Sequence, residues 1–132
     1  MLVKSNGGNG PVSNSMFQNF KGHGNNNTLQ IDAFWSGQAE VPGEGVEYND
    51  LTFSNWAGTC IDGTKQPPIQ LHCSPTLLCG SLLIEKFNIW TETGSSELYK
   101  CQNSYGVGAC MNPFAGNGAY QTTMTVATMA TA

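Results

Sequence analysis

The chain has 132 residues, a charged fraction of only 11% and a formal net charge of −4, with 16 glycines. All five basic residues are lysines and none of them cluster, so a nucleic-acid backbone is excluded as a partner. No apolar run approaches the roughly 18 residues of a membrane-spanning helix, so a membrane partner is not expected either. The length allows one modest domain or a piece of one.

The first residues, Met1–Ser5, have the pattern of the interior of a β-strand. They show no basic n-region, no apolar h-region and no small-residue cleavage site, so they are not a secretory leader. We interpret the chain as truncated at its N-terminus.

An eight-residue phrase that occurs three times is the strongest signal in the chain. Its copies are Ser15–Gly22, Leu51–Gly58 and, more loosely, Leu82–Ile89. In this alignment one slot holds Phe17, Phe53 and Ile84, and a second slot holds Phe20, Trp56 and Phe87. We expect the two slots to form two internal stacks of side chains, each side chain contributing roughly 1.5–3 kcal/mol on burial.

A shorter phrase follows each copy. Its three occurrences are Leu29–Ile31, Ile69–Leu71 and Leu98–Lys100. Two short strands per repeat, joined by Gly/Asn turns, are typical of a β-solenoid whose coils bury their apolar side chains only by stacking. His72 directly follows the second occurrence, and we expect it to pack within that strand rather than to act as an acid or base.

The spacing of the copies is uneven, with 36 residues from Asn19 to Asn55 and 31 from Asn55 to Lys86. Unequal loops on a constant strand pattern favour a parallel β-helix with long insertions over a strict hexapeptide coil. An antiparallel sandwich also has strands at turn-punctuated spacing and is the alternative. The like residues in like slots favour the solenoid.

Three positions after the first copy are candidate sites. Asn26–Thr28 is an N-glycosylation sequon and predicts a glycan on Asn26 in a surface loop. Gly22–Gly24 predicts a tight corner where the His23 imidazole hydrogen-bonds a neighbouring loop. Trp35 is the best aromatic candidate for stacking on a sugar ring, and packing in the core is an equal alternative.

Cysteine usage indicates an oxidising compartment. Cys73 and Cys79 are six residues apart, Cys101 and Cys110 are nine apart, and both spacings allow a disulfide that closes a loop. Zinc is the competing interpretation, but neither a C-x-x-C nor paired histidines accompany these cysteines, so no metal site is expected. Cys60 is left over, either as a buried thiol or as a residue whose partner lies outside this chain.

The end of the chain differs in composition from the rest. From Gly116 to Ala132 it is rich in Thr, Ala, Gly and Met and has no charge. We therefore expect residues 1–111 to form the solenoid and residues 112–132 to be a flexible tail.

Several segments together resemble the fungal rhamnogalacturonases, the rhamnogalacturonan hydrolases of glycoside hydrolase family 28. The similarity runs from Leu2 to about Cys110. Its motifs are Leu2–Gly8, Gly22–Asn25, Phe34–Ser36, Asn55–Thr59, Ile89–Gly94 and Asn103–Cys110.

The resemblance implies the C-terminal coils of a right-handed parallel β-helix, and the two proposed disulfides fit the C-terminal pattern of that family. It also implies a secreted enzyme that cuts the galacturonate–rhamnose backbone of pectin with inversion. The partner would be a pectic polysaccharide, rhamnogalacturonan I, with no cofactor, and the full-length protein would be a monomer.

The resemblance assigns one binding residue. In polygalacturonases an Arg-Ile-Lys strand grips the galacturonate carboxylate, and Leu2–Lys4 is at that position here. The Lys4 ammonium is a compact point charge suited to a sugar carboxylate. Leu2 in place of the arginine favours an alternating backbone with half the carboxylates of homogalacturonan. A solvated surface lysine is the alternative.

An inverting hydrolase needs two carboxyl groups, one as acid and one as base. Asp32, Glu92 and Glu97 are separated by long intervals, while Asp50 and Glu85 lie in the strand phrase and are expected to face solvent. We therefore expect no catalytic residue in this chain and no activity from it alone. A fragment of a polygalacturonase or xylogalacturonan hydrolase, and a non-catalytic solenoid that binds pectic sugars, are the alternatives.

Overall fold

The computed structural model describes residues 1–113 and 121–126, which form strands, turns and loops. The strands are β1 (Leu2–Lys4), β2 (Pro11–Asn25), β3 (Leu29–Asp32), β4 (Glu47–Cys60), β5 (Ile69–His72), β6 (Cys79–Thr91), β7 (Glu97–Gln102), β8 (Ser104–Val107) and β9 (Gln121–Val126). Within the described residues, no helix has the length and apolarity needed to cross a membrane.

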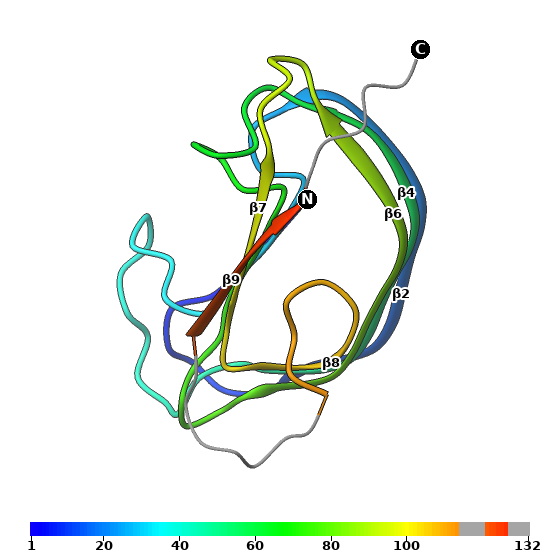
Figure 1. The fold of residues 1–132 in the computed structure, drawn as a ribbon. Helices are drawn as coiled ribbons and strands as arrows, with labels where there is room; N and C mark the ends of the chain where they lie inside the picture. Colours follow the sequence, from blue (N-terminus) through cyan, green and yellow to red (C-terminus); the bar gives the residue numbers. More distant parts are fainter. Residues whose placement is uncertain (114–120, 127–132) are drawn as a thin grey trace.

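The strands make two sheets, one with the order β1-β3-β5-β7-β9 and one with the order β2-β4-β6-β8. All pairs in these sheets are parallel except β7 with β9. Successive coils therefore stack on one another, each with a long strand in one sheet and a short strand in the other. Figure 1 looks along the stack, with β2, β4 and β6 on one side of the cross-section and β7 on the other. The predicted parallel β-helix is confirmed.

The register of the long strands agrees with the sequence repeat. Phe17 pairs with Phe53, which pairs with Ile84, and the second ladder is Phe20, Trp56 and Phe87. The Phe17 and Phe53 rings stack with centroids 5.3 Å apart, and those of Phe20 and Trp56 with centroids 4.5 Å apart. Both predicted stacks exist, although Phe20, on the first long strand, is 41% exposed.

The long strands bend at two repeated positions. At each position one residue per coil has a left-handed backbone, which a side chain other than glycine adopts only at a cost. The two sets are Asn14, Asp50 and Ser81, and Asn19, Asn55 and Lys86. Asn tolerates this conformation best, and the Asn55 amide donates to Oδ1 of Asn19 at 2.8 Å, which links two coils at this corner.

The third occurrence of the short phrase is shifted by one residue from our expectation. Ile69 and Leu71 pair with Tyr99 and Cys101, not with Leu98 and Lys100. The inward positions of β7 are Glu97, Tyr99 and Cys101, all of them buried, while Leu98 is only half-buried. The disulfide requires Cys101 to point inward, and this fixes the alternation of the whole strand.

The predicted tail also differs in part from our expectation. Residues 121–126 form β9, which pairs antiparallel with β7 along six residue pairs. Their sequence, with three threonines and a valine, has high β propensity, and the pairing satisfies the backbone groups at the edge of β7. Residues 114–120 and 127–132 of the predicted tail lie outside the described residues.

The segment that follows β8 covers the end of the core. In Figure 1 it turns back across the middle of the cross-section. Cys110 and Met111 are buried, Tyr105 forms a bridge with Asn112, and the Cys101–Cys110 disulfide ties the segment to β7. The apolar interior is thus closed at β8 by this segment rather than by a further coil.

Candidate functional site

The outer face of the five-stranded sheet carries two ladders of side chains, all of them polar except Leu2. Because parallel strands pair in register, residues from distant parts of the chain lie next to one another across the coils. From β1 to β7 the first ladder is Lys4, Asp32, His72 and Gln102, and the second is Leu2, Gln30, Gln70 and Lys100. On β9 the first continues with Gln121 and the second with Thr123, so Lys4 lies at an end of its ladder and Lys100 does not.

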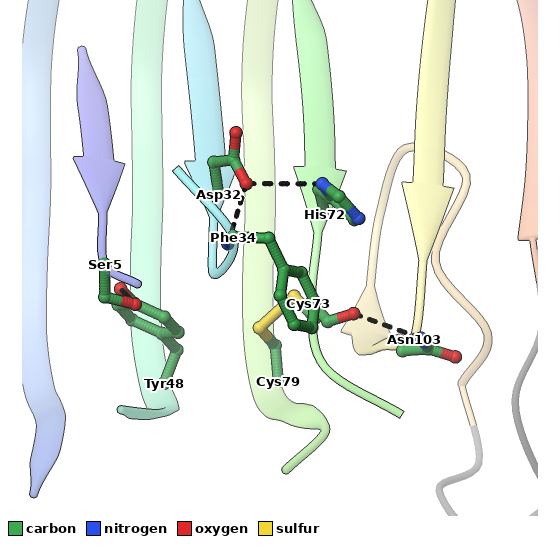
Figure 2. Close-up of polar contacts among 8 residues, drawn as sticks. All are labelled: Ser5, Asp32, Phe34, Tyr48, His72, Cys73, Cys79 and Asn103. Carbon is green, nitrogen blue, oxygen red and sulfur yellow. Dashed lines mark hydrogen bonds and ion pairs between the residues drawn. A yellow bond between two sulfur atoms is a disulfide. The ribbon is translucent and has the colours of Figure 1, made fainter. Parts of the chain in front are cut away.

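The side chains of Asp32 and His72 contact each other on this face. The distance from Oδ1 of Asp32 to Nδ1 of His72 is 3.2 Å, and the side chains are 15% and 36% exposed. The same carboxylate oxygen accepts a hydrogen bond from the backbone N–H of Phe34 at 2.9 Å. The Phe34 ring lies against His72 with centroids 5.1 Å apart (Figure 2). These contacts fix both members of the pair at the centre of the ladder.

Lys4 and Trp35, the two predicted binding residues, are brought into contact. Nζ of Lys4 lies 4.4 Å from the centroid of the Trp35 ring, within the range of a cation–π interaction. The backbone N–H of Trp35 donates to the carbonyl of Ser5 at 2.9 Å, which holds the indole beside the end of β1. Trp35 is half-buried and Lys4 is exposed, so the ammonium group remains accessible to a ligand.

Glu92 and His23 lie on a corner of the coils away from this face. Nε2 of His23 is 3.5 Å from Oε1 of Glu92, and the His23 side chain is 90% exposed. The same carboxylate oxygen accepts a hydrogen bond from the Thr59 hydroxyl at 2.9 Å. The expected contact of His23 with a neighbouring loop is therefore present, and neither residue joins Lys4.

Asn26 is exposed between β2 and β3. The following residue, Asn27, donates to the Pro67 carbonyl at 2.8 Å, and Thr28 is buried. The position of Asn26 leaves its side chain accessible, and glycosylation there stays a prediction.

Both predicted disulfides are present, Cys73 with Cys79 and Cys101 with Cys110. The first closes the turn between β5 and β6, directly below the Asp32–His72 pair in Figure 2. Cys60 is a free, fully buried thiol, and burial raises its pKa to about 11, so it stays protonated at neutral pH. Two buried disulfides fit an extracellular protein.

Asp50, Glu85 and Glu97 do not belong to the ladder of Lys4. Asp50 and Glu85 are exposed, as predicted, and Glu85 accepts a hydrogen bond from the Ser54 hydroxyl at 3.0 Å. Glu97 points into the core and is 2% exposed. The neighbours of Lys4 in its ladder are thus one carboxylate, Asp32, and then an imidazole rather than a second carboxyl group.

No model of a known protein family matches the chain. Rhamnogalacturonase A of Aspergillus aculeatus is 48% identical over 125 residues, which are 95% of this chain and 28% of that protein. A probable rhamnogalacturonase B of Aspergillus fumigatus is 45% identical over 98% of the chain and 25% of its own length. A probable rhamnogalacturonase A of Aspergillus niger is 43% identical over 96% of the chain and 28% of its own length.

The chain is a homologue of the Aspergillus rhamnogalacturonases. It spans about a quarter of the length of these curated relatives. The resemblance inferred from Leu2–Gly8 and the other motifs is confirmed over nearly the whole chain.

Two residues of the candidate site in this rhamnogalacturonase homologue were given no binding role from the sequence. No catalytic role was expected for Asp32, and His72 was expected to pack within its strand; the structure places both in the ladder of Lys4, in contact with each other. A signal was present, because the alignment of Leu29–Ile31 with Ile69–Leu71 pairs Asp32 with His72 when it is extended by one residue.

Proposed function

We propose that this chain forms part of the substrate-binding face of a secreted glycoside hydrolase that acts on rhamnogalacturonan. The contact between Lys4 and Trp35 on the outer face of the sheet is the observation that carries the proposal. The homology to rhamnogalacturonases over nearly the whole chain supports the substrate class.

In this proposal Lys4 binds the carboxylate of a galacturonate residue. Its ammonium group is accessible and has the indole of Trp35 on one side, which limits the conformations of a long, flexible side chain. Holding the cation in place before the ligand arrives reduces the entropy lost on binding. Trp35 also offers an apolar surface beside the charge, and the C–H face of a sugar ring suits such a surface.

Asp32 and His72 supply hydrogen-bonding groups next to the cation. The Asp32 carboxylate can accept from a sugar hydroxyl, and its bonds to His72 and to the Phe34 backbone keep it oriented. The ladder is therefore suited to a sugar that presents one carboxylate and several hydroxyl groups.

The two carboxyl groups that inversion requires are, in this proposal, contributed by parts of the relatives that this chain does not span. Beside Lys4 the ladder offers the single carboxylate of Asp32. The share of this chain is to bind and position the polysaccharide, and we expect it to release no reducing ends by itself.

Titration calorimetry with a rhamnogalacturonan oligosaccharide tests the binding role. Lys4→Gln should weaken binding at least tenfold, because a charge-assisted hydrogen bond contributes roughly 1.5–3 kcal/mol. Trp35→Ala should weaken it less. Lys65→Gln is the matched control, since it removes an exposed lysine from a turn between β4 and β5. Equal affinity of Lys4→Gln and the unsubstituted chain would refute the assignment.

A reducing-end assay on polymeric rhamnogalacturonan tests the catalytic part separately. We expect the chain to give the same signal as buffer. Release above buffer by the chain, abolished in an Asp32→Asn variant, would show that this quarter of the protein contains a catalytic carboxyl group after all.

A further inference from the structure

Cys60 and Glu97 lie in one corner of the core, next to the turn that joins β6 to β7. Cys60 is the last residue of β4, Glu97 is the first residue of β7, and both are buried. Burial raises the pKa of the Cys60 thiol and the charge of Glu97 raises it further, which requires the two side chains to be close. We call residues 92–96, which directly precede Glu97, the corner turn.

The burial of Glu97 is poorly compensated. The Tyr99 hydroxyl is bonded to one carboxyl oxygen at 3.4 Å, and the other oxygen has no partner among the described residues. Within residues 1–113 and 121–126, no lysine or histidine forms an ion pair with Glu97. The other titratable groups around the corner are Cys60 of β4, Tyr99 of β7, Asp62 and Glu92 at its rim, and His23 beside Glu92.

The corner turn is held to the preceding coil by long hydrogen bonds. The N–H of Thr93 donates to the Ile61 carbonyl at 3.4 Å, and the Ser95 hydroxyl donates to Oδ1 of Asp62 at 3.3 Å. Both distances exceed the usual range for their kind of bond, so each bond is weak. A shorter bond, of 2.6 Å, joins the Thr91 hydroxyl to the Ser95 carbonyl within the turn.

Bonds of ordinary length bracket this weakly held segment. On one side the N–H of Glu92 donates to the Cys60 carbonyl at 2.9 Å, and on the other the N–H of Leu98 donates to the Gly63 carbonyl at 2.9 Å. Gly94, inside the turn, has a φ of 76°, a conformation that glycine adopts without steric cost. Residues 93–97 can therefore move outward together while the coils on both sides stay paired.

We propose that the corner turn is a pH-sensitive switch, in which ionisation of Glu97 favours an open form with its carboxylate in solvent and the Cys60 thiol uncovered. A buried carboxylate without a cation is costly, whereas opening breaks a few hydrogen bonds, most of them long. Burial raises the pKa of Glu97 to about 7, so the open form becomes more populated as the pH rises toward and through 7. The switch does not depend on the proposed function.

The rate at which dithiodipyridine labels Cys60 measures the open form. The thiolate attacks the disulfide of the reagent, which forms a mixed disulfide and releases one coloured pyridinethione. Cys60 is the free cysteine of the chain, since the other four form disulfides. Dividing the rate for the unsubstituted chain by that for Glu97→Gln cancels the titration of the thiol itself. This ratio should rise about 25-fold from pH 5.5 to pH 8, because the carboxyl pKa is 4.5 when exposed and about 7 when buried.

Two matched variants locate the opening. Glu85→Gln removes an exposed carboxylate from β6, and its labelling rate should stay within about twofold of the unsubstituted chain at both pH values. Ser95→Ala removes the hydroxyl bond to Asp62 and should speed labelling about threefold at both pH values. No effect of Ser95→Ala, or an equal rise of the ratio when Glu85→Gln replaces Glu97→Gln, overturns the switch.

Urea separates opening of the corner from unfolding of the whole chain. Opening of a few residues exposes little surface, so 1 M urea should speed labelling at pH 8 by less than about twofold. Global unfolding would give roughly fivefold or more, from a slope of about 1–3 kcal/mol for each molar unit of urea. Acceleration of that size, or a ratio to Glu97→Gln that stays constant from pH 5.5 to pH 8, would likewise overturn the switch.

Discussion

Glu97 gives the most quantitative test of the solenoid interior. It is the first residue of β7, points inward and is 2% exposed. The Tyr99 hydroxyl donates to its Oε2 at 3.4 Å, and its Oε1 has no hydrogen-bond partner among the described residues. Burial raises the pKa of Glu97 from 4.5 to about 7, although the hydrogen bond from Tyr99 acts in the opposite direction.

The sign of the pH dependence follows from this raised pKa. Below pH 4.5 the carboxyl group is protonated in both the folded and the unfolded chain. Between pH 4.5 and 7 the unfolded chain loses its proton first, so the free energy of unfolding falls as the pH rises. At 1.36 kcal/mol for each unit between the two pKa values, the loss amounts to about 3 kcal/mol above pH 7.

Glu97→Gln removes the titration while it keeps the shape of the side chain. A buried amide has its own cost of about 1–3 kcal/mol when it lacks partners, but that cost does not depend on pH. The difference in unfolding free energy between variant and unsubstituted chain should therefore shift by about 3 kcal/mol in favour of the variant from pH 4 to pH 8.

Urea unfolding at pH 4, 5.5 and 8 measures this difference, with Glu85→Gln as an exposed control. The groups near Glu97 do not titrate in the window, since the pKa of Cys60 is raised to about 11 and burial raises the pKa of Tyr99 as well. A pH-dependent shift below about 1 kcal/mol for Glu97→Gln, or an equal shift for Glu85→Gln, would refute the reasoning.

Three further changes test the corners, the cap and the stacking of the coils by urea unfolding. Lys86→Asn should increase the free energy of unfolding by about 0.5–1 kcal/mol and so raise the urea midpoint. Asn tolerates the left-handed backbone at this position and can extend the amide contact between Asn55 and Asn19. A lower midpoint would contradict this. Replacing both Cys101 and Cys110 by alanine should cost about 2–3 kcal/mol, because their disulfide closes a loop between two residues nine positions apart in the sequence. No loss would mean that the cap is held by packing alone. Gly58→Ala should lower the free energy of unfolding by more than about 2 kcal/mol. The φ of Gly58 is 137°, and a Cβ there would meet the Gly22 carbonyl of the preceding coil. A near-neutral effect would show that the coils can separate at this point.

The stacked architecture could be predicted because each coil repeats a similar amino-acid phrase. Phe17 and Phe53 occupy the same slot in two copies, and in a parallel solenoid the same slot means direct pairing. The register of β7 could not be found in the same way. Leu98 has the apolarity expected of an inward residue and Glu97 does not, yet the strand turns Glu97 inward so that Cys101 can reach its disulfide partner. Here a covalent constraint outweighs the usual burial preferences of single residues.

The strand β9 was missed for a different reason. The segment Gln121–Val126 was interpreted by its lack of charge and its small residues, as part of a tail. Its threonines and valine nevertheless suit a strand, and the free edge of β7 supplies the partner. The composition of this segment therefore did not exclude a strand, because the edge of β7 was available for pairing.

The candidate site could be predicted in part because some of its residues lie on repeated strands and others lie in unrepeated loops. Lys4, Asp32 and His72 come together because the coil register repeats, so an alignment of the copies contains their proximity. The loop of residues 33–46 and the turn of residues 73–78 differ in length, so no alignment of the copies shows that Phe34 and Thr76 line one hollow between them. In a solenoid the repeated positions thus hold the ladder in a constant geometry, while the unrepeated loops are free to differ. Under the proposed function, affinity for a galacturonate should therefore be changed most readily by substitutions in the ladder.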